Sequence, residues 1–411
     1  MKIEQFLPFV VILASVSSPV VVQSAPLISI GDDIDIFFNG LSSVRWQSNV
    51  FYDEADEQDD VVFKVSPGFE MNVGRGLSDL DLSIITRYDI IRHDELSDLD
   101  NELFHFKAIS SYNTSRWDVS GLVSFSEDQS SGKDEDANQD GQINESESTI
   151  ANLSGEYRLS PKFSVGSGVN HSNKQYQDQP GLADRESFKV PVDVFYELTP
   201  KVDLSIGYTY TTTDVSGTML GDTVNGSEVG SYDKEDHFFN IGARGELLPK
   251  LSGFFKLGYR TSDSDDSSKQ TFVTGIPGAP TSTNRDSRGT MGLDTSFTYS
   301  NTPKLTTALT LHRGFDVGGT GEGTTKTSAN LSARYTINSN YSASATSGYT
   351  LREYETSGRE DNVYNMGFRL SYVPNRYWRL STGYSYNENN SSKLGQSYEA
   401  HMVDLSATLR Y

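Results

Sequence analysis

Oxygen-bearing side chains recur at alternate positions in residues 136–147. Their spacing fits D-x-[DN]-x-[DN]-G-x5-E, in which Gly141 permits a sharp turn. Calcium takes six or more oxygen ligands from carboxylates, amides and backbone carbonyls. The candidate ligands are Asp136, Asn138, Asp140, Gln142 and Glu147. The pattern predicts a calcium loop, with no other cofactor required. The flanking segments are not helical, and acidic loops match such patterns by chance, so a solvated loop without metal stays the alternative.

Histidine and serine do not form a catalytic pattern in this chain. The six histidines are His93, His105, His171, His237, His312 and His401. No pair has the metal-ligand spacing H-x-x-x-H, and no G-x-S-x-G nucleophile motif occurs. The sequence therefore predicts a protein that is not an enzyme. The catalytic alternative requires a His, a Ser and an acid or amide to meet on adjacent elements at one height.

Five arginines gather in the last third of the chain, where Asp404 is their acidic counterpart. They are Arg334, Arg352, Arg369, Arg379 and Arg410. Arginine stays charged and presents a planar fork of donors to anions and sugar hydroxyls. If these side chains line one wall of a pore, they favour anions or acidic glycans. The alternative is that they form ion pairs with opposing acidic side chains and only keep the lumen wall hydrated.

Regular alternation of apolar and polar residues defines the elements that carry these side chains. Residues 378–386 place Trp378, Leu380, Thr382, Tyr384 and Tyr386 on one face and polar residues on the other. Residues 202–210 alternate in the same way. Because successive side chains of a strand point to opposite faces, these segments are β-strands with one apolar face.

The connections between the strands alternate in length. The short ones contain Pro-Lys, at residues 160–162, 199–201, 248–250 and 302–304, and proline ends a strand cleanly. The long ones are polar and often acidic, at residues 53–60, 94–102, 128–148, 216–234 and 264–287. This arrangement indicates consecutive hairpins with short turns at one end and long loops at the other.

Counting the segments gives about 18 strands (16–18). The predicted starts are near residues 35, 61, 80, 103, 117, 149, 163, 188, 202, 236, 251, 289, 305, 327, 341, 363, 378 and 398. Residues 25–411 then supply roughly 21–22 residues for each strand and its loop, against about 9–11 needed to cross a bilayer. The even number is typical of bacterial outer-membrane barrels.

The apolar faces meet either each other, as in a soluble sandwich, or lipid, as in a membrane barrel. Many of these faces end in tyrosine, which suits the membrane interface. The polar faces are rich in Ser, Thr, Gly and charge, which suits a lumen. The last strand carries Val403, Leu405, Ala407, Leu409 and a terminal Tyr411 on one face. We therefore predict an all-β, antiparallel transmembrane β-barrel with long extracellular loops and short periplasmic turns, and keep a secreted sandwich or solenoid as the alternative.

The N-terminus has the features of an export signal. Lys2 precedes an apolar stretch from Phe6 to Val22, and small residues follow at Ser24 and Ala25. We predict a signal peptide at 1–24 and one barrel domain at 25–411. A single membrane anchor is the alternative, although two prolines interrupt the stretch.

Composition excludes several other classes. The net charge is −22, with 35% hydrophobic and 11% aromatic residues. A chain this acidic repels phosphates, so nucleic acid is not an expected partner. Disordered chains lack aromatic residues, and no stretch beyond the N-terminus approaches the length of a membrane helix.

One block near the start carries a family resemblance. Residues 48–51 read Ser-Asn-Val-Phe, an acidic loop follows, and the next strand contains Ser66-Pro67-Gly68. This block resembles the opening hairpin of the "putative beta-barrel porin 2" family, whose members are often associated with exopolysaccharide or exosortase systems. The resemblance implies an outer-membrane channel for small solutes or for exopolysaccharide export. The alternative is a non-conducting structural or adhesive barrel acting through acidic, calcium-binding loops. The implied partners are outer-membrane lipid, lipopolysaccharide, polysaccharide and, through the strand ending at Tyr411, the barrel-assembly machinery.

Overall fold

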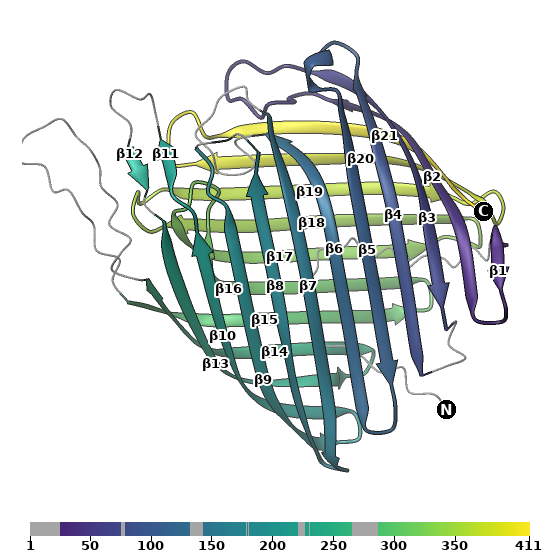
Figure 1. The fold of residues 1–411 in the computed structure, drawn as a ribbon, viewed down its shortest axis with the longest axis vertical. Helices are drawn as coiled ribbons and strands as arrows, with labels where there is room; N and C mark the ends of the chain where they lie inside the picture. The colour runs from purple at the N-terminus through teal and green to yellow at the C-terminus, as the bar shows by residue number, and fades with distance from the viewer. Residues whose placement is uncertain are drawn as a thin grey trace, which may run out of the picture.

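A single antiparallel sheet closes on itself to form the molecule (Figure 1). The structure is a computed structural model that describes residues 25–74, 79–131, 143–177, 179, 181–220, 227–229, 231–264 and 287–411. Within these ranges the sheet has 19 strands, of which β1 pairs with β2 alone, so 18 strands form the barrel as predicted. In Figure 1 the strands of the first half cross the near wall and those of the last third cross the far wall. The predicted signal segment 1–24 lies outside the described residues.

The first half of the chain contributes these elements: β1 Ile28–Ile30, β2 Ile34–Gln47, β3 Asp60–Val73, β4 Leu80–His93, η1 Ser97–Leu99, β5 Asn101–Asn113, β6 Trp117–Ser131, β7 Ile143–Ser160, β8 Phe163–Tyr176, β9 Arg185–Thr199 and β10 Val202–Val215. The second half contributes these: β11 Thr218–Leu220, β12 Ser227–Val229, β13 Tyr232–Leu248, β14 Leu251–Ser264, β15 Arg288–Thr302, β16 Leu305–Val317, β17 Gly323–Thr336, β18 Tyr341–Tyr354, β19 Glu360–Tyr372, β20 Trp378–Ser391 and β21 Tyr398–Arg410. Strands β11 and β12 pair with each other outside the barrel sheet. No helix in the described residues is long and apolar enough to cross a membrane.

Pairing of the first and last barrel strands closes the sheet. Strand β2 pairs with β3 on one side and with β21 on the other, in a register that sets Asn39 opposite Arg410. The backbones of Phe38 and Tyr411 exchange two hydrogen bonds, at 2.6 and 2.9 Å. A closed sheet leaves no edge with unpaired backbone groups, which is what a bilayer requires.

The outer face of the barrel is apolar and carries aromatic side chains near both ends. On β19, Met366 and Phe368 are 54% and 53% exposed, whereas the intervening Gly367 and the following Arg369 point to the other face. Aromatic pairs at the short-turn end include Trp117 with Tyr157, at 4.6 Å between centroids, and Tyr341 with Tyr372, also at 4.6 Å. Other aromatic pairs, such as Tyr349 with Tyr364, lie nearer the long-loop end. This arrangement matches two interfacial girdles around an apolar belt.

The four predicted Pro-Lys turns are all present, and each is preceded by a bulge in the register, at residues 159, 198, 247 and 301. In three of them a hydroxyl before the proline accepts backbone N–H groups from the turn, as Thr199 does from Lys201 and Val202 at 3.3 and 3.1 Å. In the fourth, Leu248 replaces the hydroxyl residue, and Lys250 has a positive φ of 68°. A Ser or Thr hydroxyl therefore stabilises the turn in three cases, and the turn without one contains a residue in the left-handed region.

Loops pack against one another at the long-loop end. Ala183, Val215, Tyr232 and Val317 form a buried apolar cluster there. The backbone N–H of Ala183, in the β8–β9 connection, donates to the carbonyl of Gly319, in the β16–β17 connection, at 2.8 Å. These two connections are separated by several strands around the barrel, so they narrow the mouth between them.

Two predicted loops are shorter than expected. Strands β6 and β7 cover residues 128–131 and 143–148, and β11 and β12 lie within 216–234. The prediction that these stretches are entirely loop was wrong, because β6 and β7 continue past the apolar belt and β11 and β12 pair with each other outside the barrel sheet. Polar side chains suffice where a strand leaves the lipid.

Candidate functional site

The inner face of the barrel holds the polar and charged side chains that sequence alternation assigned to it. They form connected groups that we name by one member each: the Arg244 cluster, the Lys256 cluster, the Asp89 cluster and the arginine wall. Each draws its members from several strands. The wall is therefore built from charge pairs instead of an apolar core.

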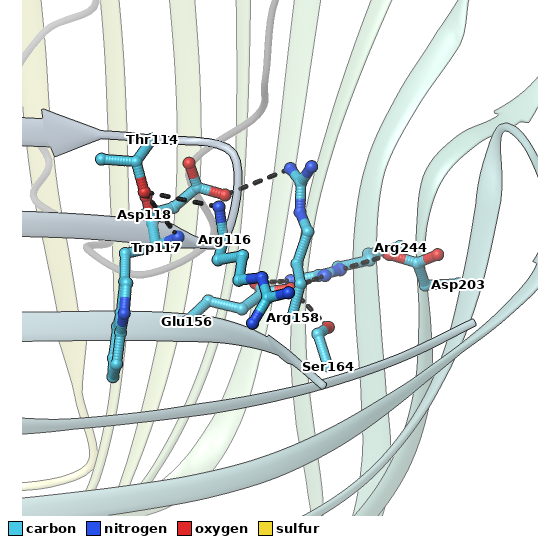
Figure 2. A network of polar contacts seen from close by, with 9 residues as sticks. All are labelled: Thr114, Arg116, Trp117, Asp118, Glu156, Arg158, Ser164, Asp203 and Arg244. Atoms are coloured by element: carbon cyan, nitrogen blue, oxygen red, sulfur yellow. Dashed lines mark hydrogen bonds and ion pairs between the residues drawn. The ribbon is translucent and has the colours of Figure 1, made fainter. Parts of the chain in front are cut away.

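The Arg244 cluster lies near the short-turn end (Figure 2). The Arg244 guanidinium of β13 donates two hydrogen bonds to Glu156 of β7, both at 2.7 Å, and its Nε donates to Asp203 of β10 at 3.0 Å. Ser164 of β8 donates to Glu156 at 2.5 Å. The guanidinium lies 3.5 Å from the centroid of the Phe195 ring, which is almost fully buried. One side chain thus spans the inner wall from β13 to β7.

A second charge pair extends the Arg244 cluster along the wall. Arg158 of β7 contacts Asp118 of β6 at 3.3 Å. Figure 2 shows the Arg158 guanidinium turned toward Asp118 and the Arg244 side chain reaching from Asp203 to Glu156, while Trp117 points away from the group. The cluster therefore contains two guanidinium groups and three carboxylates.

The Lys256 cluster occupies the middle of the same wall. The Lys256 ammonium of β14 contacts both carboxylate oxygens of Asp193 of β9, at 2.7 and 2.8 Å. A Cβ atom at Gly207 of β10 would overlap the Asp193 carboxylate, so glycine makes room for the pair. Next to it, Asp294 of β15 binds Arg260 at 2.5 Å and His312 at 2.6 Å.

The Asp89 cluster lies on the near wall beside the Ser-Pro-Gly block. Asp89 of β4 contacts Arg87 at 2.7 Å, His105 at 3.2 Å and Lys64 at 3.4 Å. The β3–β4 register omits Ser66 and Pro67 and resumes at Gly68, because proline has no N–H for the ladder. The carboxylate thus lies among a guanidinium, an ammonium and an imidazole. This is a charge cluster and not a nucleophile beside a base.

The arginine wall contains the five predicted pore-lining residues. In each strand the arginine lies at a position that alternates with the apolar residues of the outer face. Arg369 makes a bidentate pair with Asp404, at 2.9 and 3.0 Å. Arg410 makes one with Glu70, at 2.8 and 3.1 Å. Arg334, Arg352 and Arg379 lie on the same face of β17, β18 and β20. The charges of Arg369 and Arg410 are therefore neutralised locally. The sequence did not pair Arg410 with Glu70, which lies 340 positions away in the chain.

The predicted calcium ligands are described only in part. Asp136, Asn138, Asp140 and Gln142 lie outside the described residues. Glu147 lies within β7, directly opposite Glu127 of β6, and accepts a hydrogen bond from Gln177 at 2.9 Å. Among the described residues no group of three or more metal-type ligands converges.

The Ser-Asn-Val-Phe block forms a latch between β2 and β21. The fully buried Asn49 side chain donates to the carbonyls of Asp53 at 2.7 Å and Glu399 at 3.1 Å and accepts from the Asp53 N–H at 2.9 Å. Ser48 exchanges hydrogen bonds with the backbone of His401. The Phe51 carbonyl accepts from Ser131 of β6 at 2.6 Å, so the segment crosses β4 and β5.

Sequence reasoning missed aromatic rings on the inner face, among them Phe195 and Phe238. Phe195 and Phe238 lie under the guanidinium groups of Arg244 and Arg260, at 3.5 and 3.8 Å. Their signal was a break in alternation, because residues 194–196 and 238–239 are consecutive apolar runs. Such cation–π contacts orient arginine side chains along the wall.

A closed sheet with an apolar, aromatic-rimmed outer face and a charged inner face defines a channel-type transmembrane β-barrel. The chain belongs to the "Putative beta-barrel porin 2" family, whose profile matches residues 42–411. No curated protein matches the chain.

Solved barrels resemble the chain at low identity. They include OpdK of Pseudomonas aeruginosa with vanillate, at 10% identity over 92% of this chain and 99% of that chain, with a TM-score of 0.44. The ferric-catecholate import receptor Fiu of E. coli K12 has 8% identity, coverage of 94% and 82%, and a TM-score of 0.49. A bacterial polysaccharide outer membrane secretin has 10% identity, coverage of 93% and 100%, and a TM-score of 0.35.

Proposed function

We propose that the protein is an outer-membrane channel through which small polar solutes diffuse. The single observation that supports this most is the opposition of two faces on one closed sheet. The outer face carries apolar residues such as Phe368, and the inner face carries ion pairs such as Arg369–Asp404. Barrels of 16–18 strands leave a water-filled lumen. On this proposal the long-loop end is extracellular and the short-turn end is periplasmic.

The paired charges suit weak selectivity. Each cluster places a carboxylate within hydrogen-bonding distance of a guanidinium, an ammonium or an imidazole, so the field along the wall changes sign over short distances. Neutral, hydroxyl-rich solutes pass such a wall by exchanging hydrogen bonds with it. Exopolysaccharide export, implied by the family resemblance, would use the same wall for a longer chain. Lipopolysaccharide would surround the extracellular rim, and the strand that ends at Tyr411 would engage the assembly machinery.

The first experiment is single-channel recording of the purified protein in a planar bilayer, with ion selectivity taken from the reversal potential. Open steps with weak selectivity support the diffusion channel. A correctly folded barrel that never conducts contradicts it.

A second candidate is a barrel whose extracellular mouth opens only with a partner. It is favoured by the contact between Ala183 and Gly319, by the hydrogen bond from Tyr232 Oη to Gly321 at 2.8 Å, and by the Arg185 bond to the Val317 carbonyl. Deleting residues 318–322 separates the candidates. Conductance that appears only after the deletion supports the closed mouth, and equal conductance supports the open channel.

A further inference from the structure

Within the described residues, the hydrogen-bond ladder between β15 and β16 is open at the long-loop end, although the Arg313 Nε of β16 still donates to the Thr290 hydroxyl of β15 at 3.4 Å. The register of this pair begins with Leu293 opposite Arg313 and continues to the short turn. Beyond that point, residues 288–292 are paired with β14 and residues 314–317 with β17. Within the described residues, each strand thus keeps its other neighbour while this seam separates. In a lipid-facing sheet such an interruption requires other groups to satisfy the backbone.

Two glycines mark the inner end of the open seam. Gly292 of β15 and Gly314 of β16 flank the Arg260 side chain of β14. A Cβ atom at Gly292 would lie 2.8 Å from Arg260 Nε, and one at Gly314 would lie 3.1 Å from it. Larger residues would displace this arginine, which is held by Asp294 and by the Phe238 ring. The seam therefore reaches the charged inner wall of the barrel.

A recess of about 420 Å³ occupies the seam. Its lining includes Arg288, Thr290, Arg313, Phe315, Glu353 and Glu355. Arg288 pairs with Glu355, and Arg313 lies 3.6 Å from Glu353. Arg313 is an even number of residues from the outward-facing Leu309 and so lies on the outer face of β16. Arg288 is an even number of residues from the inward-facing Asp294 and so lies on the inner face of β15. The lining of the recess thus draws side chains from both faces of the sheet.

The lining combines three kinds of group. The Phe315 ring supplies a flat apolar surface, with the Arg288 guanidinium 4.9 Å and the Lys234 ammonium 5.6 Å from its centroid. The two arginine–carboxylate pairs supply planar donors beside acceptors. Thr290 and Thr325 add hydroxyls. The charges within the lining cancel, which disfavours a strongly anionic ligand.

We propose that this recess is a saccharide-binding site set between β15 and β16 at the long-loop end of the barrel wall. A sugar ring has an apolar face of C–H groups that packs on an aromatic ring, and hydroxyls that both donate and accept. The volume lies within the range of small-ligand sites. The saccharide comes either from solution or from the lipopolysaccharide that adjoins this rim. The proposal rests on the proposed outer-membrane location, but it does not require conduction.

The test measures saccharide binding to the full-length mature protein in detergent. Maltotriose is titrated by calorimetry and saturation-transfer NMR, and lipopolysaccharide that co-purifies is quantified by native mass spectrometry. We expect Phe315→Leu and Arg288→Gln each to weaken binding about ten-fold or more, the equivalent of one lost stacking or charged hydrogen-bond contact. Maltotriose binding identifies a soluble saccharide, and retention of lipopolysaccharide alone identifies the leaflet as the source.

A matched control keeps the result interpretable. Arg92 also pairs with a carboxylate, Glu102, at the long-loop end but lies outside the recess. Arg92→Gln should bind as the wild type does, and heat-modifiable migration on gels verifies that every variant is folded. Failure of the wild type to bind either probe, or binding by both recess variants within two-fold of the wild type, overturns the proposal. A non-conducting wild type that still binds contradicts the diffusion channel and not this site.

Discussion

Arg244 and Glu156 form a bidentate pair although β8, β9 and β10 lie between their strands. Backbone hydrogen bonds hold neighbouring strands together, but they do not fix the curvature of the wall over four strand spacings. The Arg244 side chain spans this distance and therefore restricts that curvature. The pair therefore sets the shape of the lumen near the short-turn end as well as its charge.

Replacing Arg244 with alanine should destabilise the barrel. The change leaves the Glu156 and Asp203 carboxylates without their shared cation, and it uncovers Phe195. We expect a loss of about 1–3 kcal/mol, the range for breaking a largely buried charged hydrogen bond. Urea-induced unfolding followed by gel migration measures it. Lys201→Gln is the matched control, because its pair with Glu246 is exposed, screened by solvent and should contribute little to stability. Equal effects of the two variants would contradict the assignment.

The charge balance of the arginine wall predicts the direction of ion selectivity. Asp404→Asn removes the carboxylate that neutralises Arg369, so the anion-to-cation permeability ratio should rise. A change of about two-fold is expected from one charge at a water-filled wall. Reversal potentials in a salt gradient measure the ratio.

The complementary variant tests the predicted anion preference of the same wall. Substituting Arg352, Arg369 and Arg379 together with alanine should lower the anion permeability ratio. The hypothesis fails if the triple variant retains wild-type selectivity. Arg92→Gln, outside the lumen clusters, should leave the reversal potential unchanged.

The latch at Asn49 predicts a local rather than a global effect. Asn49→Ala removes three hydrogen bonds that join β2, β21 and the following loop, worth about 2–3 kcal/mol together. Amide exchange in residues 48–59 should accelerate roughly 30–100-fold. Hydrogen-exchange mass spectrometry locates the change. Asn390→Ala, which loses only an exposed contact with Glu388, serves as the control. Unchanged exchange at 48–59 would show that the side chain does not hold the loop.

The barrel was predictable from the sequence because lipid imposes a strict alternation. Strand starts at the short-turn end agree with the structure within one residue, as at Trp117, Val202 and Trp378. At the long-loop end the predicted starts fall up to six residues late, as for β7, which begins at Ile143 instead of 149. There the strands extend beyond the apolar belt, and polar residues occupy both faces, as the exposed Glu145 and the buried Asn144 and Ser146 do. Apolar–polar alternation carries no signal where both faces are polar.

The sequence predicts which residues line the inner face, but not which of them form ion pairs with one another. Parity alone places Arg244, Asp203 and Glu156 inside the barrel. Which carboxylate Arg244 binds depends on the tilt and stagger of the strands, and these are not determined by the residues next to Arg244 in the sequence. The open seam beside Gly292 and Gly314 was equally hidden, because glycine in a strand marks a close approach without naming the approaching group. Arg260 of a third strand is that group.

Calcium binding by residues 136–147 remains a prediction with a direct test. Glu147 faces Glu127 across β6 and β7, and like charges placed opposite each other destabilise a sheet unless a cation lies nearby. Millimolar calcium should therefore slow proteolysis between residues 128 and 148, in the affinity range of extracellular calcium modules. Glu147→Gln and Asp136→Asn should each abolish most of this protection. Cleavage at residues 392–397, outside the motif, provides the internal control and should not respond. Proteolysis of the wild type that is equally fast with calcium and with chelator would show that the loop is a solvated acidic segment, because a bidentate carboxylate ligand cannot bind calcium without ordering the chain that carries it.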